Sequence, residues 1–180
     1  MKHNYHDTIE LNGYSFGIRY EHDDSSSEPW KECDGHGIVS EWTRRDKAAG
    51  ERILCSDRSS YRYYDVAAAL KLARNDQWGC KHSTGEYIDG KYVFSSGHKT
   101  KGELAACAVD SDFEYLRAWC NNQWSYVVVL VEWLDDTDVS TALGGVETYK
   151  NYHVTVAKEL AEELLSQIEI ESPDTVLSNN

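Results

Sequence analysis

Alternating hydrophobic and polar residues predict an extended strand near the start of the chain. In residues 13–21, every second position holds a large apolar side chain, namely Tyr14, Phe16, Ile18 and Tyr20. Successive side chains of a strand point to opposite faces of its sheet, so these four share one face. Residues 37–42 and 51–55 are shorter β-like runs joined by a charged turn, and we expect them to pair as a hairpin.

Three segments have apolar residues at the spacing of three or four positions that is typical of helices. The first is expected to begin at Asp57 or Ser59, both acceptable N-cap residues, and to end near residue 76. The second spans residues 101–120 and the third residues 152–170. Residues 172–180 are expected to form a flexible tail after the third helix.

The strongest strand signal lies between the second and third helices. Residues 124–134 (WSYVVVLVEWL) are rich in β-branched and aromatic side chains, and their continuous apolar character indicates a central strand buried on both faces. A turn at residues 135–138 and a returning strand over residues 139–148 follow. Strands and helices do not alternate strictly, so we expect an α+β fold. In this fold a mostly antiparallel sheet of about five strands packs against about three helices, in a single domain over residues 1–171.

Composition places the chain among globular proteins. Of its 180 residues, 41% are hydrophobic, which is enough for one domain with its own core. No apolar run approaches the roughly 20 residues that span a bilayer, and the first residues lack the apolar core of a secretory signal. We therefore expect a soluble protein without a membrane partner. Five irregularly spaced cysteines indicate free thiols in a reducing cytoplasm: Cys33, Cys55, Cys80, Cys107 and Cys120.

The net charge of −13 is unevenly distributed along the sequence. Residues 1–102 contain 16 acidic and 15 basic residues, whereas residues 103–180 contain 15 acidic and only three basic ones. This acidity argues against general binding to nucleic-acid backbones. Residues 44–74 are locally basic and leave nucleic-acid binding open there, with Arg58 and Arg62 as the candidate contacts.

The acidic C-terminal part suggests a negatively charged binding surface. The candidates are Glu159, Glu162 and Glu163 of the third helix with Asp135 and Asp136 of the preceding turn. Such carboxylates can stand where a DNA-binding enzyme expects phosphates, as in a protein inhibitor that mimics DNA. The alternative is an ordinary solvated face, because an amphipathic helix must expose one side to water.

Residues 34–37, Asp-Gly-His-Gly, bring a carboxylate and an imidazole close together in a glycine-flanked segment. Asp34 and His36 are therefore the candidate catalytic residues, since such a pair can bind a metal or move a proton. A tight turn in which Asp34 accepts hydrogen bonds from local backbone amides explains the same residues without catalysis.

Two cysteine–histidine pairs raise the question of a zinc site. Cys33 and His36 form one pair and Cys80 and His82 the other, but the second spacing is tighter than zinc sites usually have. The chain contains no phosphate-binding loop, dinucleotide-binding glycine motif, nucleophile elbow or His-Glu-x-x-His sequence. We therefore expect no cofactor.

Two segments are similar to a group of uncharacterised accessory proteins of tailed bacteriophages. One runs from Pro29-Trp30 through Asp34-Gly35-His36-Gly37 to Trp42 and on to Gly50-Glu51, and the other covers residues 116–126. The resemblance extends over most of residues 14–170, and it departs from the group at Ala48-Ala49, where a proline is expected before Gly50. It assigns a role to no residue. It implies a small phage protein that binds host machinery or blunts host defences.

These observations favour a non-enzymatic protein that binds a host protein in the host cytoplasm, as a takeover factor or an inhibitor of a defence system. The alternative is a small metal-assisted hydrolase centred on Asp34 and His36. Nucleic-acid binding through residues 44–74 is the third and less favoured hypothesis.

Overall fold

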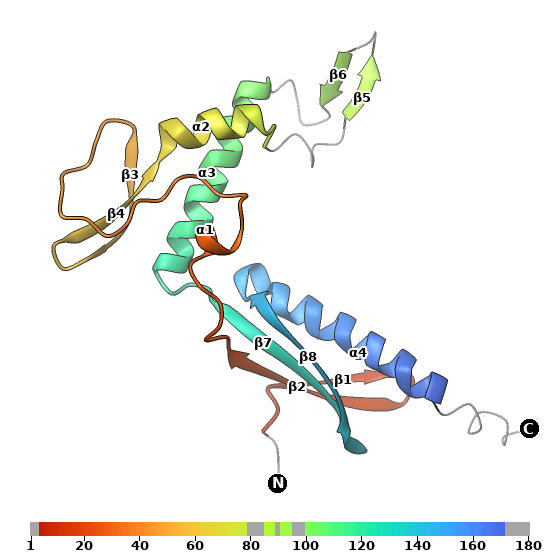
Figure 1. Cartoon of the computed structure of the whole chain (residues 1–180). Helices are drawn as coiled ribbons and strands as arrows, with labels where there is room; N and C mark the ends of the chain where they lie inside the picture. Colours follow the sequence, from red (N-terminus) through yellow and green to blue (C-terminus); the bar gives the residue numbers. More distant parts are fainter. Residues whose placement is uncertain (1–3, 79–84, 89–90, 95–99, 172–180) are drawn as a thin grey trace, which may run out of the picture. The chain divides into compact units, whose positions relative to one another are not determined.

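The computed structural model describes residues 4–78, 85–88, 91–94 and 100–171 (Figure 1). The chain divides into two compact units, described here one at a time. Unit 1 comprises Met1–Ser26 and Trp124–Asn180, and unit 2 comprises Ser27–Gln123. Every strand pairing in the described residues is antiparallel, and helices and strands are both present, which confirms the α+β class. The expected tail at residues 172–180 lies outside the described residues, and the single domain stays a prediction.

Unit 1 is built on a four-stranded sheet with the strand order β1-β2-β7-β8. A two-residue turn, Asn12-Gly13, joins the first two strands, and both residues have positive φ, at 50° and 85°. This pairing of Asn with Gly suits the tight turns that match the twist of a hairpin. The strands are β1 (Asp7–Leu11), β2 (Tyr14–His22), β7 (Tyr126–Trp133) and β8 (Asp136–Glu147).

Helix α4 (Tyr152–Glu171) covers one face of this sheet. A short 3-10 helix, η1 (Tyr149–Asn151), leads into it. Apolar residues of α4 at helical spacing are buried and pack against β2 and β7, so the prediction for residues 152–170 is confirmed. The core of unit 1 includes Phe16, Ile18, Val129, Val131, Val156, Leu160, Leu164 and Ile168.

Strand β7 takes the central position that its sequence predicts, between β2 and β8. Its burial differs between the two faces. Val127, Val129 and Val131 are buried in the core under α4, whereas Val128 and Leu130 between them are only half-buried. Alternate positions of a strand face opposite sides of the sheet, so the continuous apolar run marks one fully buried face and one partly covered face.

Unit 2 contains two hairpins and three helices in the described residues. Its core is separate from that of unit 1 and includes Leu54, Tyr64, Ala69, Val109, Phe113 and Leu116. The elements are α1 (Pro29–Glu32), β3 (Glu51–Asp57), β4 (Ser60–Asp65), α2 (Val66–Asn75), β5 (Gly85–Ile88), β6 (Lys91–Phe94) and α3 (Lys101–Cys120).

Two predictions for unit 2 were wrong. Strand β3 pairs with β4 instead of with residues 37–42, which contribute only a single bridge from Val39 to Tyr64. The helix expected from Asp57 or Ser59 begins at Val66, because residues 60–65 form β4. Three tyrosines in residues 61–64 favour a strand. Asp65 then caps α2 by accepting a hydrogen bond from the Ala68 amide.

Helix α3 spans the predicted residues 101–120. A capping box begins it, in which the Thr100 hydroxyl accepts from the Glu103 amide while the Glu103 carboxylate accepts from the Thr100 amide. This reciprocal arrangement satisfies backbone groups that the first turn of a helix leaves without partners. Its buried residues, Leu104, Val109, Phe113 and Leu116, recur at helical spacing.

Candidate functional sites

Unit 1 exposes the acidic residues that the sequence singles out. Glu159, Glu162 and Glu163 lie on the face of α4 that points away from the sheet, and Glu169 continues this face one turn before the helix ends. Lys158 forms an ion pair with Glu162, at 3.9 Å. Asp135 and Asp136 are also exposed, at the turn between β7 and β8. We call these six residues the acidic surface.

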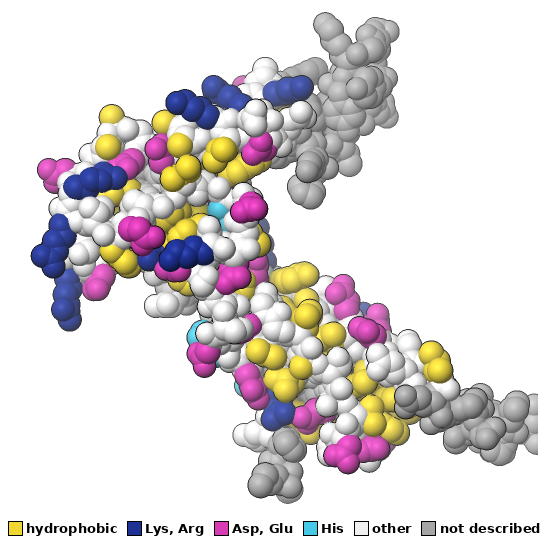
Figure 2. Space-filling view, viewed as in Figure 1, with side chains coloured by type: hydrophobic (Ala, Val, Ile, Leu, Met, Phe, Trp, Pro, Cys, Tyr) yellow, Lys and Arg dark blue, Asp and Glu magenta, His cyan; other side chains and the backbone are white. Residues whose placement is uncertain are grey.

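Nearly all of the net negative charge belongs to one of the two units. Unit 1 holds 16 acidic and four basic residues, a balance of −12, whereas unit 2 holds 15 acidic and 14 basic residues, a balance of −1. Figure 2 shows the same contrast, with most of the visible Lys and Arg side chains on the elements of unit 2. The sequence boundary near residue 103 misplaces the change in charge, because unit 1 is assembled from both ends of the chain.

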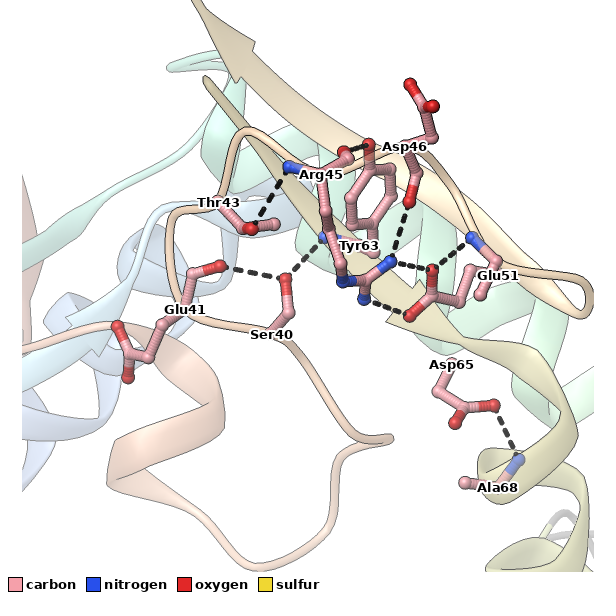
Figure 3. A network of polar contacts seen from close by, with 10 residues as sticks. Ser40, Glu41, Thr43, Arg45, Asp46, Glu51, Tyr63, Asp65 and Ala68 are labelled. Atoms are coloured by element: carbon pink, nitrogen blue, oxygen red, sulfur yellow. Dashed lines mark hydrogen bonds and ion pairs between the residues drawn. The ribbon is translucent and has the colours of Figure 1, made fainter.

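Three arginines of the basic segment of residues 44–74, namely Arg45, Arg52 and Arg62, have partners within unit 2. Arg45 forms a two-pronged ion pair with Glu51 at 2.5 and 2.7 Å, and its guanidinium lies over the ring of Tyr63 (Figure 3). Arg52 pairs with Asp110 at 2.7 Å. The contacts of Arg45 hold the loop before β3 against the β3–β4 hairpin. The ion pair of Arg52 with Asp110 holds α3 against the same hairpin.

Of the two candidate nucleic-acid contacts, Arg62 is buried. Its guanidinium is 2.8 Å from Glu28 and lies 5.0 Å from the ring centres of both Trp30 and Trp42. Burial raises the pKa of the Glu28 carboxyl, but hydrogen bonds from Arg62 and Lys31 outweigh it and lower this pKa to about 2. Arg58 is exposed at the turn between β3 and β4. The structure therefore leaves only Arg58 of this pair at the surface.

His36 is held by Asp112 of α3, and Asp34 is exposed. The Nδ1 atom of His36 lies 2.6 Å from Asp112 Oδ1, and the other carboxylate oxygen accepts from the Gly37 amide at 2.8 Å and the Tyr64 hydroxyl at 2.7 Å. The ring of His36 stacks on Tyr115, with centroids 5.4 Å apart. The hydrogen-bond partner of the imidazole thus comes from a distant helix and not from the neighbouring Asp34, and the catalytic role of Asp34 and His36 stays a prediction.

The side chain of Asp112 is only 8% exposed, and it joins three backbone segments. Burial and the hydrogen bond to Asp112 raise the pKa of the Tyr64 hydroxyl, so this group remains a donor. Gly37 is required next to it, because a Cβ there would collide with the ring of Tyr64. With Nδ1 as the donor to Asp112, the imidazole of His36 has Nε2 left to accept a proton. The arrangement can therefore fix the loop of residues 33–40 on α3, and it orients an imidazole as a base.

One sequence signal could have identified Asp112. It lies between Val109 and Phe113 on the apolar stripe of α3, three residues after the first and one before the second. A carboxylate on such a stripe must find hydrogen-bond donors when the helix packs. The sequence does not reveal that His36, Gly37 and Tyr64 supply them, because these residues are distant along the chain.

Only two of the four zinc-ligand candidates, Cys33 and His36, lie in the part of the chain that the structure describes. Cys33 is exposed and His36 is bound to Asp112. Cys80 and His82 lie outside the described residues. Among residues 4–78 and 100–171, no three His, Cys, Asp or Glu side chains lie close enough together to bind a metal ion.

Comparisons with family models, with curated proteins and with solved structures found no match for this chain. Among the described helices, none combines the length and the apolar character needed to cross a membrane.

Proposed function

We propose that this protein is a phage-encoded accessory protein that binds a host protein in the host cytoplasm, with the acidic surface of unit 1 as its binding face. The observation that carries the proposal is the balance of −12 in unit 1 against −1 in unit 2. Exposed charges of one sign attract an oppositely charged partner and speed its association. The partner is therefore a host protein with a basic surface.

The charge density of α4 limits how far this surface can mimic DNA. Glu159 and Glu169 are about 15 Å apart along the helix axis, at about 1.5 Å per residue. Over the same length, duplex DNA carries roughly nine negative charges, whereas this face of α4 presents four carboxylates. A DNA-mimicking inhibitor would need Asp135 and Asp136 as well, so we propose binding to a basic protein surface in general, with nuclease inhibition as one case.

Two matched variants test the proposal. The unit 1 variant carries Glu159→Gln, Glu162→Gln and Glu163→Gln, and the unit 2 variant carries Asp34→Asn, Glu41→Gln and Asp57→Asn, three exposed acids that serve as the control. Each variant loses the same charge. The immobilised proteins would be incubated with host lysate at low and moderate salt, and the captured proteins quantified by mass spectrometry.

We expect the wild type and the unit 2 variant to capture the same basic host protein, and the unit 1 variant to capture at least tenfold less of it at low salt. Capture of no host protein at either salt concentration would contradict the proposal. Equal losses in both variants would contradict the assignment to the acidic surface.

A hydrolase centred on His36 is a second candidate, and one observation favours it: Asp112 orients the imidazole at 2.6 Å. An imidazole whose Nδ1 is held by a carboxylate is suited to accept protons at Nε2. Metal analysis of the purified protein, with His36→Ala and Asp34→Ala as controls, tests the metal-assisted form. Metal bound by the wild type but lost in His36→Ala is the expected result for a hydrolase, and equal metal content in all three proteins would contradict it.

A further inference from the structure

Two cysteines that are distant in sequence meet in unit 2. Cys55 lies in β3 and Cys120 is the last residue of α3. Both are half-buried free thiols, and a hydrogen bond joins their side chains. Cys33 and Cys107, by contrast, are exposed. The pair is thus a feature of the folded unit that the irregular spacing of the cysteines does not reveal.

Neighbouring residues fix the pair from both sides. Arg62 faces Cys55 directly across the β3–β4 ladder, at the irregularity that follows Ile53. Its guanidinium lies over Trp30, and Trp30 contacts the edge of Trp119, the residue before Cys120. The strand and the end of the helix are therefore linked through two tryptophans and one arginine. Strand β3 also packs directly against α3, and Cys120 lies against the buried cluster that contains Leu54, the residue before Cys55.

The surroundings make the two thiols unequal. The hydrogen bond from Cys120 lowers the pKa of the Cys55 thiol, and the positive charge of Arg62 lowers it further against the effect of burial. The Nε atom of Arg62 is buried and has no hydrogen-bond partner among the described residues. The same hydrogen bond raises the pKa of Cys120. A thiol with a lowered pKa next to a cation is the more reactive one, because the thiolate is the nucleophile.

We infer that Cys55 and Cys120 form a dithiol site that low-molecular-weight disulfides of the glutathione type oxidise to an intramolecular disulfide. This inference is independent of the proposed function, since it concerns unit 2 alone. Cys55 is the attacking residue and Cys120 the resolving residue.

The reaction proceeds in two exchange steps. The Cys55 thiolate attacks one sulfur of glutathione disulfide, forms a mixed disulfide and releases one glutathione thiolate, which takes up a proton. The Cys120 thiol loses its proton and attacks the Cys55 sulfur, forming the internal disulfide and releasing the second glutathione. Two protein thiols are oxidised, and one glutathione disulfide is reduced to two thiols. The product links β3 to the end of α3.

The experiment uses a full-length variant with Cys33→Ser, Cys80→Ser and Cys107→Ser, which retains only the pair. After incubation with glutathione disulfide, intact-mass spectrometry distinguishes loss of two hydrogens from addition of glutathione. Matched controls carry Cys55→Ser or Cys120→Ser in the same background. Because the serine substitutions could affect folding, wild-type protein is treated in parallel, alkylated and mapped by peptide mass spectrometry.

We expect the pair variant to lose two hydrogens without retaining glutathione, and wild-type digests to contain a disulfide-linked peptide of Cys55 and Cys120. In the pair variant, where both thiols are present, brief alkylation at neutral pH followed by peptide mass spectrometry should label Cys55 at least tenfold faster than Cys120. Retention of two glutathiones, a pair that stays reduced, or wild-type digests without the linked peptide would overturn the inference. Equal rates for the two cysteines would overturn the assignment of Cys55 as the attacking residue.

Discussion

Unit 1 and unit 2 contain almost the same number of acidic residues, 16 and 15, but only four and 14 basic ones. In unit 2 three arginines, Arg45, Arg52 and Arg62, each pair with a carboxylate and lie over an aromatic ring. In unit 1 the exposed acids of α4 share their helix with a single lysine, Lys158, and no arginine. The comparison shows that the number of acids does not make a charged surface. The net charge of each unit is set instead by its number of basic residues, four in unit 1 and 14 in unit 2.

Truncating a core side chain should have the largest effect on stability, and it tests whether the two units are distinct. Leu164 of unit 1 and Leu116 of unit 2 are both almost completely buried, in separate clusters. Replacing either with Ala should lower the free energy of unfolding by about 2–5 kcal/mol. Hydrogen exchange read by mass spectrometry should localise the change: Leu164→Ala should accelerate exchange in β1, β2, β7, β8 and α4 more than in α2 and α3. Uniform acceleration across the chain would contradict the division.

The next largest effect on stability comes from comparing two carboxylates of α3, one covered and hydrogen-bonded and the other in an exposed ion pair. Asp112→Ala removes three hydrogen bonds and leaves the Gly37 amide and the Tyr64 hydroxyl without an acceptor, so it should destabilise the protein by about 2–4 kcal/mol. Asp110→Ala, two positions earlier on α3, removes an exposed ion pair with Arg52 and should cost about 1 kcal/mol or less. Urea denaturation measures both values. Equal costs would show that Asp112 does not hold the loop.

Features that depend on a local sequence pattern could be predicted, whereas contacts between residues far apart in the sequence could not. Helices α3 and α4 and the central strand β7 could be predicted, because each has a long periodic or continuous apolar pattern of its own. The start of α2 was missed, because tyrosines that suited a helical spacing formed β4 instead. Strand β1 was also missed, although Asn12-Gly13 is a hairpin signal. The partners of His36 and Cys55 could not be predicted, because both come from α3 through tertiary packing.

Acid sensitivity offers a third comparison, since both units contain a carboxyl with a lowered pKa. In unit 1, hydrogen bonds from Ser25 and from the Gly145 amide lower the pKa of Asp23 to about 2, and this side chain holds the irregular part of β8. A folded-state pKa below the unfolded value of about 3.9 means that the stabilisation is present above pH 4 and is lost as the pH falls toward 2.

Asp23→Asn should therefore be less stable than the wild type near neutral pH, and the difference should shrink as the pH falls and vanish near pH 2. Denaturant unfolding at a series of pH values measures it. Asp24→Asn is the matched control, because Asp24 is exposed. A difference between wild type and Asp23→Asn that is constant with pH would contradict the lowered pKa.

The smallest expected effect concerns how the two long helices begin. Helix α3 has its capping box at Thr100, whereas α4 follows Lys150 and Asn151, which have positive φ values of 49° and 62°. Because a side chain is strained in this region and glycine is not, Lys150→Gly should stabilise the protein by about 1 kcal/mol. Lys158→Gly within α4 should destabilise it by a similar amount, about 1 kcal/mol. Thermal unfolding should therefore separate the two variants in opposite directions.

The central claim is that the acidic surface of unit 1 attracts a basic protein partner. Its most direct test is the association rate of the captured host protein with the wild type and with the two charge-matched triple variants, measured over a range of salt concentrations. We expect the association rates of the wild type and the unit 2 variant to fall steeply and together as salt rises. The unit 1 variant should associate at least tenfold more slowly at low salt and depend less on salt. A wild-type rate that is independent of salt, or a unit 2 variant as slow as the unit 1 variant, would contradict it.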